Sequence, residues 1–274
     1  MSGNPEIGKS IAVGGIHTNY IEAGSGPPLV LIHGSGPGVT AFANWNGVIP
    51  TLAEYFHVFA PDMAGFGYTE CAGTIERFTL DLWVGQLLGF MDALDIQQAR
   101  LIGNSFGGAI ALALAERNPL RVSRFVLMGS AGLDFPITPG LAAVWGYEPS
   151  AHNMRQLMQT FAYNPCLVTD AIVQSRFEAS IRPSAQQQFA RMFPEPRQAK
   201  LSALATPESR IGEISHPALI VHGREDAIVP VELAYKFCSL LKHSELHVFG
   251  ECGHWTQIEK KDRFLQVVVP FLRS

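Results

Sequence analysis

The chain has 274 residues, of which 47% are hydrophobic and 16% charged, and its formal net charge is −4. This length and hydrophobic content exclude a disordered chain and favour one large core, or a core domain with an insertion. The net negative charge, without any basic cluster, argues against nucleic-acid binding. The scattered cysteines, Cys71, Cys166, Cys238 and Cys252, indicate neither a disulfide framework nor a zinc site. A polar N-terminus and the lack of a long apolar run predict a cytoplasmic protein that does not enter the membrane.

The first part of the chain alternates short β-prone runs with turns. Residues 10–13 and 17–22 flank Gly14 and Gly15, a composition typical of an edge hairpin. Residues 28–32 form an apolar run typical of a buried parallel strand, and a glycine-rich loop follows at 33–38. The loop could present backbone N–H groups to an oxyanion. A dinucleotide loop is the competing interpretation, but Val39 stands where its third glycine would lie.

A strand and a helix then lead to the most informative motif of the chain. Residues 57–60 predict a strand and 81–94 an amphipathic helix, and between them Asp62 begins a turn-rich loop in which its side chain organises backbone. The apolar run 99–102 leads into Gly-Asn-Ser-Phe-Gly-Gly at 103–108, and an alanine-rich helical segment follows. A serine in G-x-S-x-G between a strand and a helix lies on a sharp turn that exposes its hydroxyl. Ser105 is therefore the candidate nucleophile.

The alternation stops between residues 133 and 209 and then resumes. Seven prolines between Pro136 and Pro196 divide this segment into short helical pieces, such as 153–161 and 169–180. We expect residues 1–132 and 210–274 to form one core domain, with 133–209 inserted as a helical lid over the carboxyl edge of the sheet. Strands are predicted at 218–221 and 245–249 and helices at 231–241 and 262–272, with Pro270 distorting the last turn.

Several reactive side chains follow the carboxyl ends of predicted strands. In an open parallel sheet this edge is where ligands bind, so Ser105, Asp226 and His254 are expected to share one crevice. Their order in the chain is that of α/β-hydrolases. His254 would act as general base and Asp226 would orient it, with Glu225 as the rival carboxylate. His33 and His222 also follow strands, and either could be a structural histidine. The backbone N–H groups of Phe106 and Ser35 would hold the oxyanion.

The sequence resembles the meta-cleavage product hydrolases, which are carbon–carbon bond hydrolases of bacterial aromatic catabolism within the α/β-hydrolase superfamily. The resemblance covers nearly the whole chain. The motifs that carry it are the glycine-rich loop at 33–38 with Asn44, the motif around Ser105, the stretch 176–180, Gly-Arg-Glu-Asp at 223–226 and Cys-Gly-His-Trp at 252–255. G-x-S-x-G is common to many esterases, whereas Asn104, Arg176 and Trp255 together are a narrower set. The resemblance implies an α/β-hydrolase fold, no cofactor or metal, and a homo-oligomer.

The resemblance also implies a substrate and roles for further residues. The substrate would be a 2-hydroxy-6-oxohexa-2,4-dienoate, cleaved to 2-hydroxypenta-2,4-dienoate and a carboxylic acid. Arg176, Asn104 and Trp255 would hold its carboxylate, because a guanidinium matches a carboxylate bidentately. Gly36 and Asn44 would lie near the 2-hydroxy group. Candidates for the pocket of the 6-substituent, all of which could equally be packing residues, are Phe161, Leu141, Ile228 and Ala131.

Two other interpretations remain open. A carboxylesterase or lactonase would use the same three side chains on a carbon–oxygen bond, but an ester of a neutral acid would not need Asn104, Arg176 and Trp255. A non-catalytic binding protein of the same fold would not need a complete set of reactive side chains. Dehalogenases and epoxide hydrolases place aspartate where this chain has Ser105, which argues against both.

Overall fold

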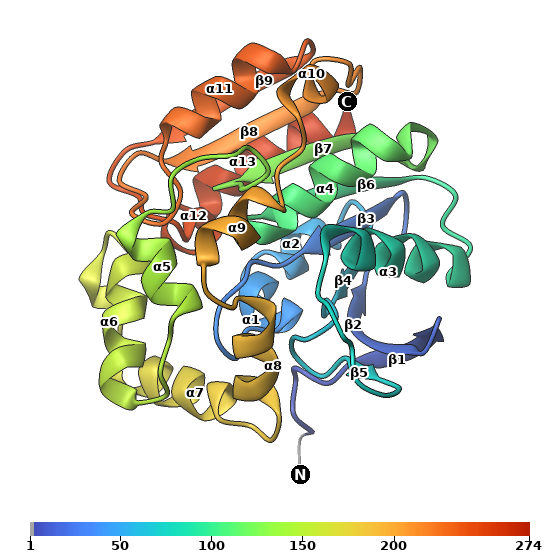
Figure 1. Ribbon diagram of the computed structural model, residues 1–274. Helices are drawn as coiled ribbons and strands as arrows, with labels where there is room; N and C mark the ends of the chain where they lie inside the picture. The colour runs from blue at the N-terminus through green and yellow to red at the C-terminus, as the bar shows by residue number, and fades with distance from the viewer. Residues whose placement is uncertain (1–2) are drawn as a thin grey trace.

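The computed structural model describes residues 3–274, and a single twisted sheet runs through their centre (Figure 1). The strand order is β1-β2-β4-β3-β6-β7-β8-β9, with β5 paired to β2. β1 and β2 form an antiparallel hairpin, and the strands from β4 to β9 along this order run parallel. The strands are β1 Lys9–Val13, β2 Ile16–Ala23, β3 Pro28–Ile32, β4 His57–Pro61, β5 Glu70–Cys71, β6 Ala99–Asn104, β7 Val122–Met128, β8 Ala218–Gly223 and β9 Ser244–Phe249. This arrangement confirms the predicted α/β class.

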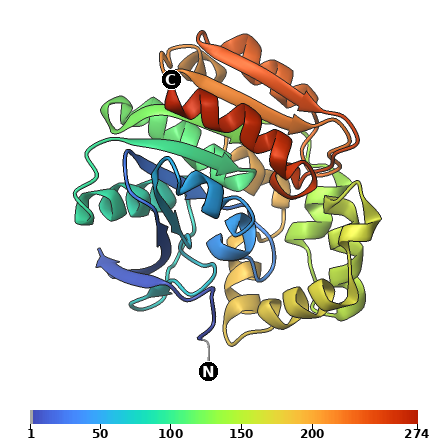
Figure 2. The same cartoon turned by 180° about the vertical axis from the view of Figure 1, so that it is seen from behind.

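The central strands are buried on both faces because helices cover the sheet from two sides. Along β8 every residue is buried, and in β3 only Pro28 is partly exposed. α3 (Leu80–Ala93), α4 (Phe106–Arg117) and α11 (Glu232–Leu240) pack into one apolar cluster, whereas α1 (Ala41–Trp45), α2 (Ile49–Leu52) and α13 (Lys261–Arg273) pack into another. Figure 2 shows α13 lying along the back of the sheet. Continuous apolar strands are the expected pattern for this layered arrangement.

The chain between β7 and β8 is helical and extends beyond the ends of the strands. Figure 1 shows α5 to α8 gathered to one side of the sheet layers. Thr138, Ser150 and Thr169 accept hydrogen bonds from backbone N–H groups at the starts of α5, α6 and α7, so side chains cap three of these short helices. The helices are α5 Pro139–Trp145, α6 Ala151–Phe161, α7 Asp170–Ser180, α8 Ala185–Met192, α9 Arg197–Ser202 and α10 Glu208–Ile211. The remaining helical pieces are η1 Pro119–Arg121, η2 Pro165–Leu167 and α12 Thr256–Glu259.

One local feature was not predicted from the sequence, and another agrees with its predicted range. The pattern at residues 41–52 did not indicate helix, yet α1 and α2 lie there and bury Trp45 and Leu52 against the sheet. The helix predicted at 262–272 is α13, which runs through Pro270 to Arg273, and the Ser274 N–H donates to the Pro270 carbonyl oxygen at 3.1 Å. Leu272 is fully buried in the same cluster, so packing against the sheet holds the last turn. Within residues 3–274 no helix has the length and apolar character needed to span a membrane.

Candidate active site

Ser105 lies on a strained turn between β6 and α4. Its φ of 53° and ψ of −114° place a non-glycine residue in a sparsely populated region of backbone space. The turn is held by the Ser105 N–H, which donates to the Met128 carbonyl at 2.9 Å, and by close backbone packing. A Cβ on Gly107 would lie 2.3 Å from the Ile32 carbonyl oxygen, so no side chain larger than hydrogen fits there. The motif therefore fixes the backbone of Ser105 at the edge of the sheet.

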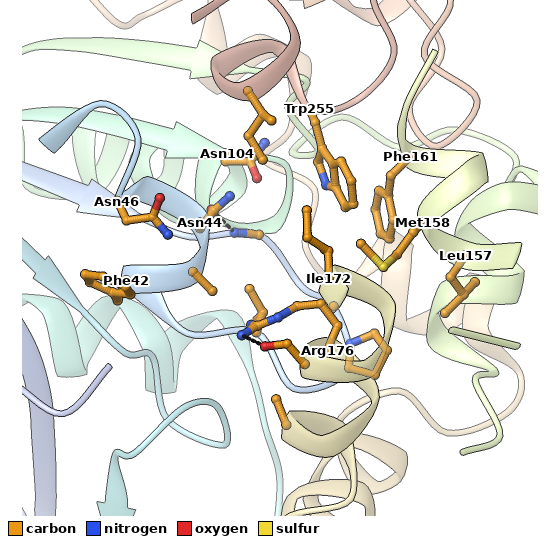
Figure 3. Close-up of a pocket in the computed structure, with 18 of the residues that line it drawn as sticks. Phe42, Asn44, Asn46, Asn104, Leu157, Met158, Phe161, Ile172, Arg176 and Trp255 are labelled. Atoms are coloured by element: carbon orange, nitrogen blue, oxygen red, sulfur yellow. Dashed lines mark hydrogen bonds between the residues drawn. The ribbon is translucent and has the colours of Figure 1, made fainter. Parts of the chain in front are cut away.

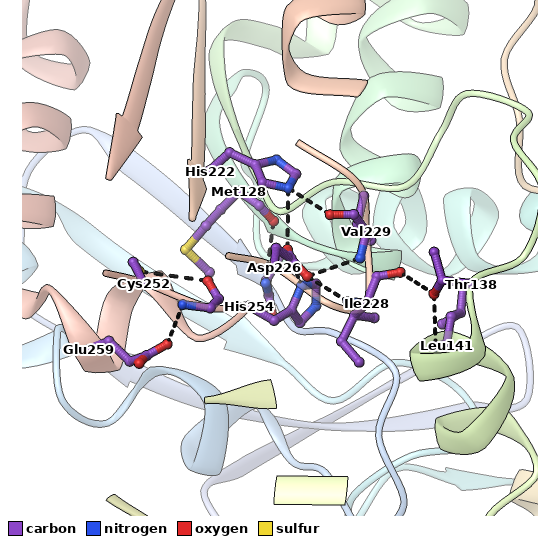
Figure 4. Close-up of polar contacts among 12 residues, drawn as sticks. Met128, Thr138, Leu141, His222, Asp226, Ile228, Val229, Cys252, His254 and Glu259 are labelled. Atoms are coloured by element: carbon purple, nitrogen blue, oxygen red, sulfur yellow. Dashed lines mark hydrogen bonds and ion pairs between the residues drawn. The ribbon is translucent and has the colours of Figure 1, made fainter. Parts of the chain in front are cut away.

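Asp226 and His254 meet in the loops that follow β8 and β9 (Figure 4). The His254 Nδ1 lies 2.7 Å from the Asp226 Oδ2. The other carboxylate oxygen, Oδ1, accepts hydrogen bonds from the N–H groups of Ile228 and Val229 at 2.8 and 2.9 Å. His222 also faces the carboxylate, with its Nε2 3.3 Å from Oδ2 and 2.9 Å from the Val229 carbonyl oxygen. The carboxylate is thus fixed from several directions.

These neighbours set the ionisation of Asp226. Burial alone would raise its pKa, but the charge of His254 and the hydrogen bonds from His222 and His254 hold the pKa below the ordinary range. The side chain stays a carboxylate at neutral pH and can accept a hydrogen bond from the His254 Nδ1–H. The rival Glu225 instead accepts a hydrogen bond from the Cys252 N–H at 3.0 Å and pairs with Arg224.

A cavity of about 900 Å³ opens beside these side chains. Ser105 and His254 both line it, although each is almost fully buried. Phe106 is the first residue of α4, so its backbone N–H has no partner within the helix, although Phe106 is not among the residues that line the cavity. Ser35 also lines the cavity, and its hydroxyl accepts a hydrogen bond from the Trp145 indole at 3.0 Å. The arrangement can hold a developing negative charge next to a hydroxyl and an imidazole.

The predicted substrate-binding residues all line this cavity (Figure 3), and they are Gly36, Asn44, Asn104, Phe161, Arg176 and Trp255. The Asn44 Oδ1 accepts from the Gly34 N–H at 3.0 Å, and the Asn104 Nδ2 donates to the Met128 carbonyl at 3.3 Å. Phe161 and Trp255 stack, with ring centroids 5.2 Å apart and planes 8° from parallel. Leu141 and Ile228 line the cavity too. Ala131 is instead buried behind the serine, where its N–H donates to the Ser105 carbonyl.

Arg176 does not lie beside Asn104 and Trp255 as the resemblance implies. Figure 3 shows those two side chains at one end of the cavity and Arg176 at the other. There the Arg176 Nη2 is 2.7 Å from the Glu6 Oε1, and this ion pair holds the guanidinium. The sequence carried no signal for the pair, because 170 residues separate its members.

His33 and His222 take different places. Burial lowers the pKa of His33 to about 4, and its Nε2 accepts the Met63 N–H at 2.9 Å, so the ring is a neutral structural group. His222 is a structural histidine as well, but one that contacts the Asp226 carboxylate. Among residues 3–274 no group of three or more His, Cys, Asp or Glu side chains is arranged to hold a metal ion.

Comparisons with known proteins agree with this architecture. Residues 27–261 match the alpha/beta hydrolase fold family. A 2-hydroxymuconate semialdehyde hydrolase from Pseudomonas sp. strain CF600 is 52% identical over 98% of this chain and 95% of its own length. A 2-hydroxy-6-oxo-2,4-heptadienoate hydrolase from Pseudomonas putida is 50% identical over 99% of this chain and 98% of its own length.

Solved structures give the same result. A meta-cleavage product hydrolase from Pseudomonas fluorescens IP01 superposes with a TM-score of 0.97 at 51% identity, covering 98% of this chain and 99% of the other. The 2-hydroxy-6-oxo-6-phenylhexa-2,4-dienoate hydrolase from Rhodococcus sp. strain RHA1 gives 0.87 at 33% identity over 97% and 98% of the two chains. The chain therefore belongs to the meta-cleavage product hydrolases of the alpha/beta hydrolase fold family.

Proposed function

We propose that this enzyme hydrolyses the carbon–carbon bond of a 2-hydroxy-6-oxohexa-2,4-dienoate with Ser105, His254 and Asp226 as its catalytic triad. The observation that carries the proposal is the hydrogen bond of 2.7 Å between His254 and Asp226 at the rim of the cavity that Ser105 lines. The carboxylate fixes the imidazole tautomer whose Nε2 is free to accept a proton. Family membership supports the reaction class.

The difficulty of the reaction is its carbon leaving group. The dienol must first become the keto tautomer, so that the electron pair of the breaking bond flows into the conjugated oxo acid. Ser105 then adds to the C6 carbonyl carbon while His254 takes its proton, and the backbone N–H groups of Phe106 and Ser35 hold the oxyanion. The C5–C6 bond then breaks, its electron pair passes along the conjugated chain to the C2 carbonyl oxygen, and this oxygen takes the proton from the His254 imidazolium to give the 2-hydroxydienoate. Water then releases the carboxylic acid from the serine. Asp226 stabilises the imidazolium throughout.

The other cavity residues would orient the anionic substrate. Arg176 is proposed to hold the C1 carboxylate and Gly36 and Asn44 to lie at the 2-hydroxy group. Asn104 and Trp255, at the other end of the cavity, are proposed to contact the rest of the substrate. Phe161, packed flat on Trp255, would contact the 6-substituent. We propose that this substituent is hydrogen or methyl, because the relatives at 50–52% identity act on the semialdehyde and the heptadienoate. A side-by-side rate comparison of 6-methyl and 6-phenyl dienoates tests this assignment.

The assembly around the site is also proposed. Residues 133–209 would act as a lid over the cavity and the rest of the chain as the core domain. We propose that the protein is cytoplasmic and forms a homo-oligomer of at least two chains. Light scattering on the purified protein tests the oligomeric state.

The central experiment mixes the protein with the yellow ring-fission product of a catechol and follows its visible absorbance. The wild type is expected to bleach the colour, and Ser105→Ala to lose turnover by a factor on the order of 10⁶ while still binding the dienoate. Persistent colour together with rapid turnover of p-nitrophenyl esters would identify a carboxylesterase instead. Near-native bleaching by Ser105→Ala would remove Ser105 from its role.

A further inference from the structure

The ion pair between Glu6 and Arg176 forms part of the cavity wall. Both residues line the cavity, and both side chains are largely withdrawn from solvent, with 12% of Glu6 and 23% of Arg176 exposed. Only one terminal nitrogen of the guanidinium, Nη2, contacts Glu6 at 2.7 Å. The other, Nη1, is buried without a hydrogen-bond partner among residues 3–274. The guanidinium is thus half engaged.

Glu6 is anchored in this place by its backbone. The Glu6 carbonyl accepts a hydrogen bond from the Asn19 Nδ2 at 3.0 Å, and the Gly8 N–H donates to the Asn19 Oδ1 at 2.9 Å. Asn19 is in turn held by the buried carboxylate of Asp62 at 2.8 Å. The Glu6 N–H donates to the Asn4 Oδ1, and the Asn4 Nδ2 to the Tyr68 hydroxyl. The carboxylate is therefore presented to the cavity by a fixed segment.

Arg182 and Lys261 also line the cavity, and the Arg182 Nη1 is buried without a partner as well, but among residues 3–274 Arg176 is the one of these three cations that forms an ion pair. Arg182 lies over the Tyr68 ring at 4.1 Å and donates to the Ala179 carbonyl. Glu178, also at the cavity, accepts from Gln174 at 2.7 Å and does not contact Arg176. A guanidinium has several N–H donors in one plane, so it can donate hydrogen bonds to two carboxylates at once. Two carboxylates on one guanidinium repel each other, however, and more strongly where water is partly excluded.

We propose that Glu6 is an internal competitor for the anion site at Arg176, so that a substrate carboxylate binds by displacing it. This inference rests on the proposed function, in which Arg176 receives the C1 carboxylate. Glu6 forms an ion pair with Arg176 while no substrate is bound. It therefore weakens the binding of any anion that interacts with the site through its charge alone. A dienoate that also contacts the opposite end of the cavity can displace it. Glu6 is thus a specificity-determining residue that discriminates against simple anions.

The experiment measures the dissociation constant of the 6-methyl dienoate in a Ser105→Ala background, from the change in its visible absorbance. Glu6→Gln keeps the shape of the side chain and removes its charge. We expect it to bind the dienoate about tenfold more tightly, which corresponds to about 1.4 kcal/mol. Glu178→Gln is the matched control, because it removes an equal charge from the same cavity without altering the ion pair. This control is expected to change the dissociation constant less than twofold.

A second pair of variants separates this inference from the proposed function. Arg176→Gln is expected to weaken dienoate binding at least tenfold, and adding Glu6→Gln to it should then change binding less than twofold. If Glu6→Gln binds the dienoate no more tightly than the Glu6 protein does, and the two have the same midpoint of thermal unfolding, the proposed competition is wrong. Full dienoate affinity in Arg176→Gln overturns both the competition and the role of Arg176. Turnover of the dienoate by the wild-type enzyme tests the proposed reaction separately from these binding measurements.

Discussion

Two strand-end turns of this enzyme each bury an aspartate, and the two carboxylates behave in opposite ways. Asp62, after β4, accepts hydrogen bonds from the backbone N–H groups of Ala41 and Tyr68 and from Asn19. Asp226, after β8, faces two imidazoles. Burial raises the pKa of Asp62 to about 6, whereas the histidines hold the pKa of Asp226 below its ordinary range against the same effect of burial.

The difference shows that partners, rather than residue type or position along the strand, separate a structural carboxylate from a reactive one. Neutral N–H donors satisfy Asp62 but only partly offset the removal of its charge from water. The imidazoles around Asp226 can carry the compensating charge, and one of them reaches the cavity. Asp62 organises loops, whereas in the proposed mechanism Asp226 stabilises the charge that develops on His254.

The substitution Asp226→Asn is the strongest test of the difference between the two aspartates. The amide oxygen can keep the hydrogen bonds from Ile228 and Val229, but the amide NH₂ would face His254 Nδ1 and select the tautomer with hydrogen on Nε2. That ring cannot accept the serine proton, so kcat should fall by about 10⁴. Dienoate bleaching measures it, and circular dichroism should report an intact fold. A loss smaller than tenfold would contradict the assigned role of Asp226.

We expect Asp62 to affect the unfolding free energy of the protein and its pH dependence rather than the rate of turnover. A carboxyl group whose pKa is raised on folding binds its proton more tightly in the folded state. Its contribution to the unfolding free energy is therefore greatest below pH 4 and is lost as the pH rises to about 6. The rise of about two pKa units corresponds to about 3 kcal/mol.

Asp62→Asn removes this titration and leaves the other groups in place. The unfolding free energy of the wild type relative to the variant should therefore drop by about 2 kcal/mol between pH 4 and pH 7, because the carboxyl of the unfolded chain is already partly ionised at pH 4. Urea denaturation at the two pH values measures the difference. A difference that is independent of pH would show that Asp62 titrates in the folded protein as it does in the unfolded chain.

The same two turns show how much the sequence could predict. Apolar runs that end in glycine-rich turns predicted the strands and placed Ser105, Asp226 and His254 at one edge, because the carboxyl ends of parallel strands meet there. The sequence could not predict that His222 faces Asp226, nor that Glu6 pairs with Arg176. Such contacts depend on side-chain orientation and on chain segments brought together by the whole fold. The helices α1 and α2 were missed because each spans too few residues to show a period.

His222 offers the smallest and most specific test of the comparison. Its Nε2 faces two acceptors, the Val229 carbonyl and the Asp226 carboxylate, so we assign the hydrogen to that nitrogen. His222→Leu removes the donor and leaves the carboxylate less restrained, so kcat should fall about tenfold, an effect of about 1.4 kcal/mol.

The split between kcat and KM identifies the role of His222 as positioning. His222 is buried beneath the cavity rather than lining it, so KM for the dienoate should stay within twofold. His222→Gln retains an N–H donor on a side chain of similar reach and should recover most of kcat. Equal losses in the Leu and Gln variants would mean that the ring acts by packing alone. In that case backbone N–H groups would restrain the Asp226 carboxylate, as they restrain that of Asp62. His254 would then be the partner that makes the two carboxylates differ.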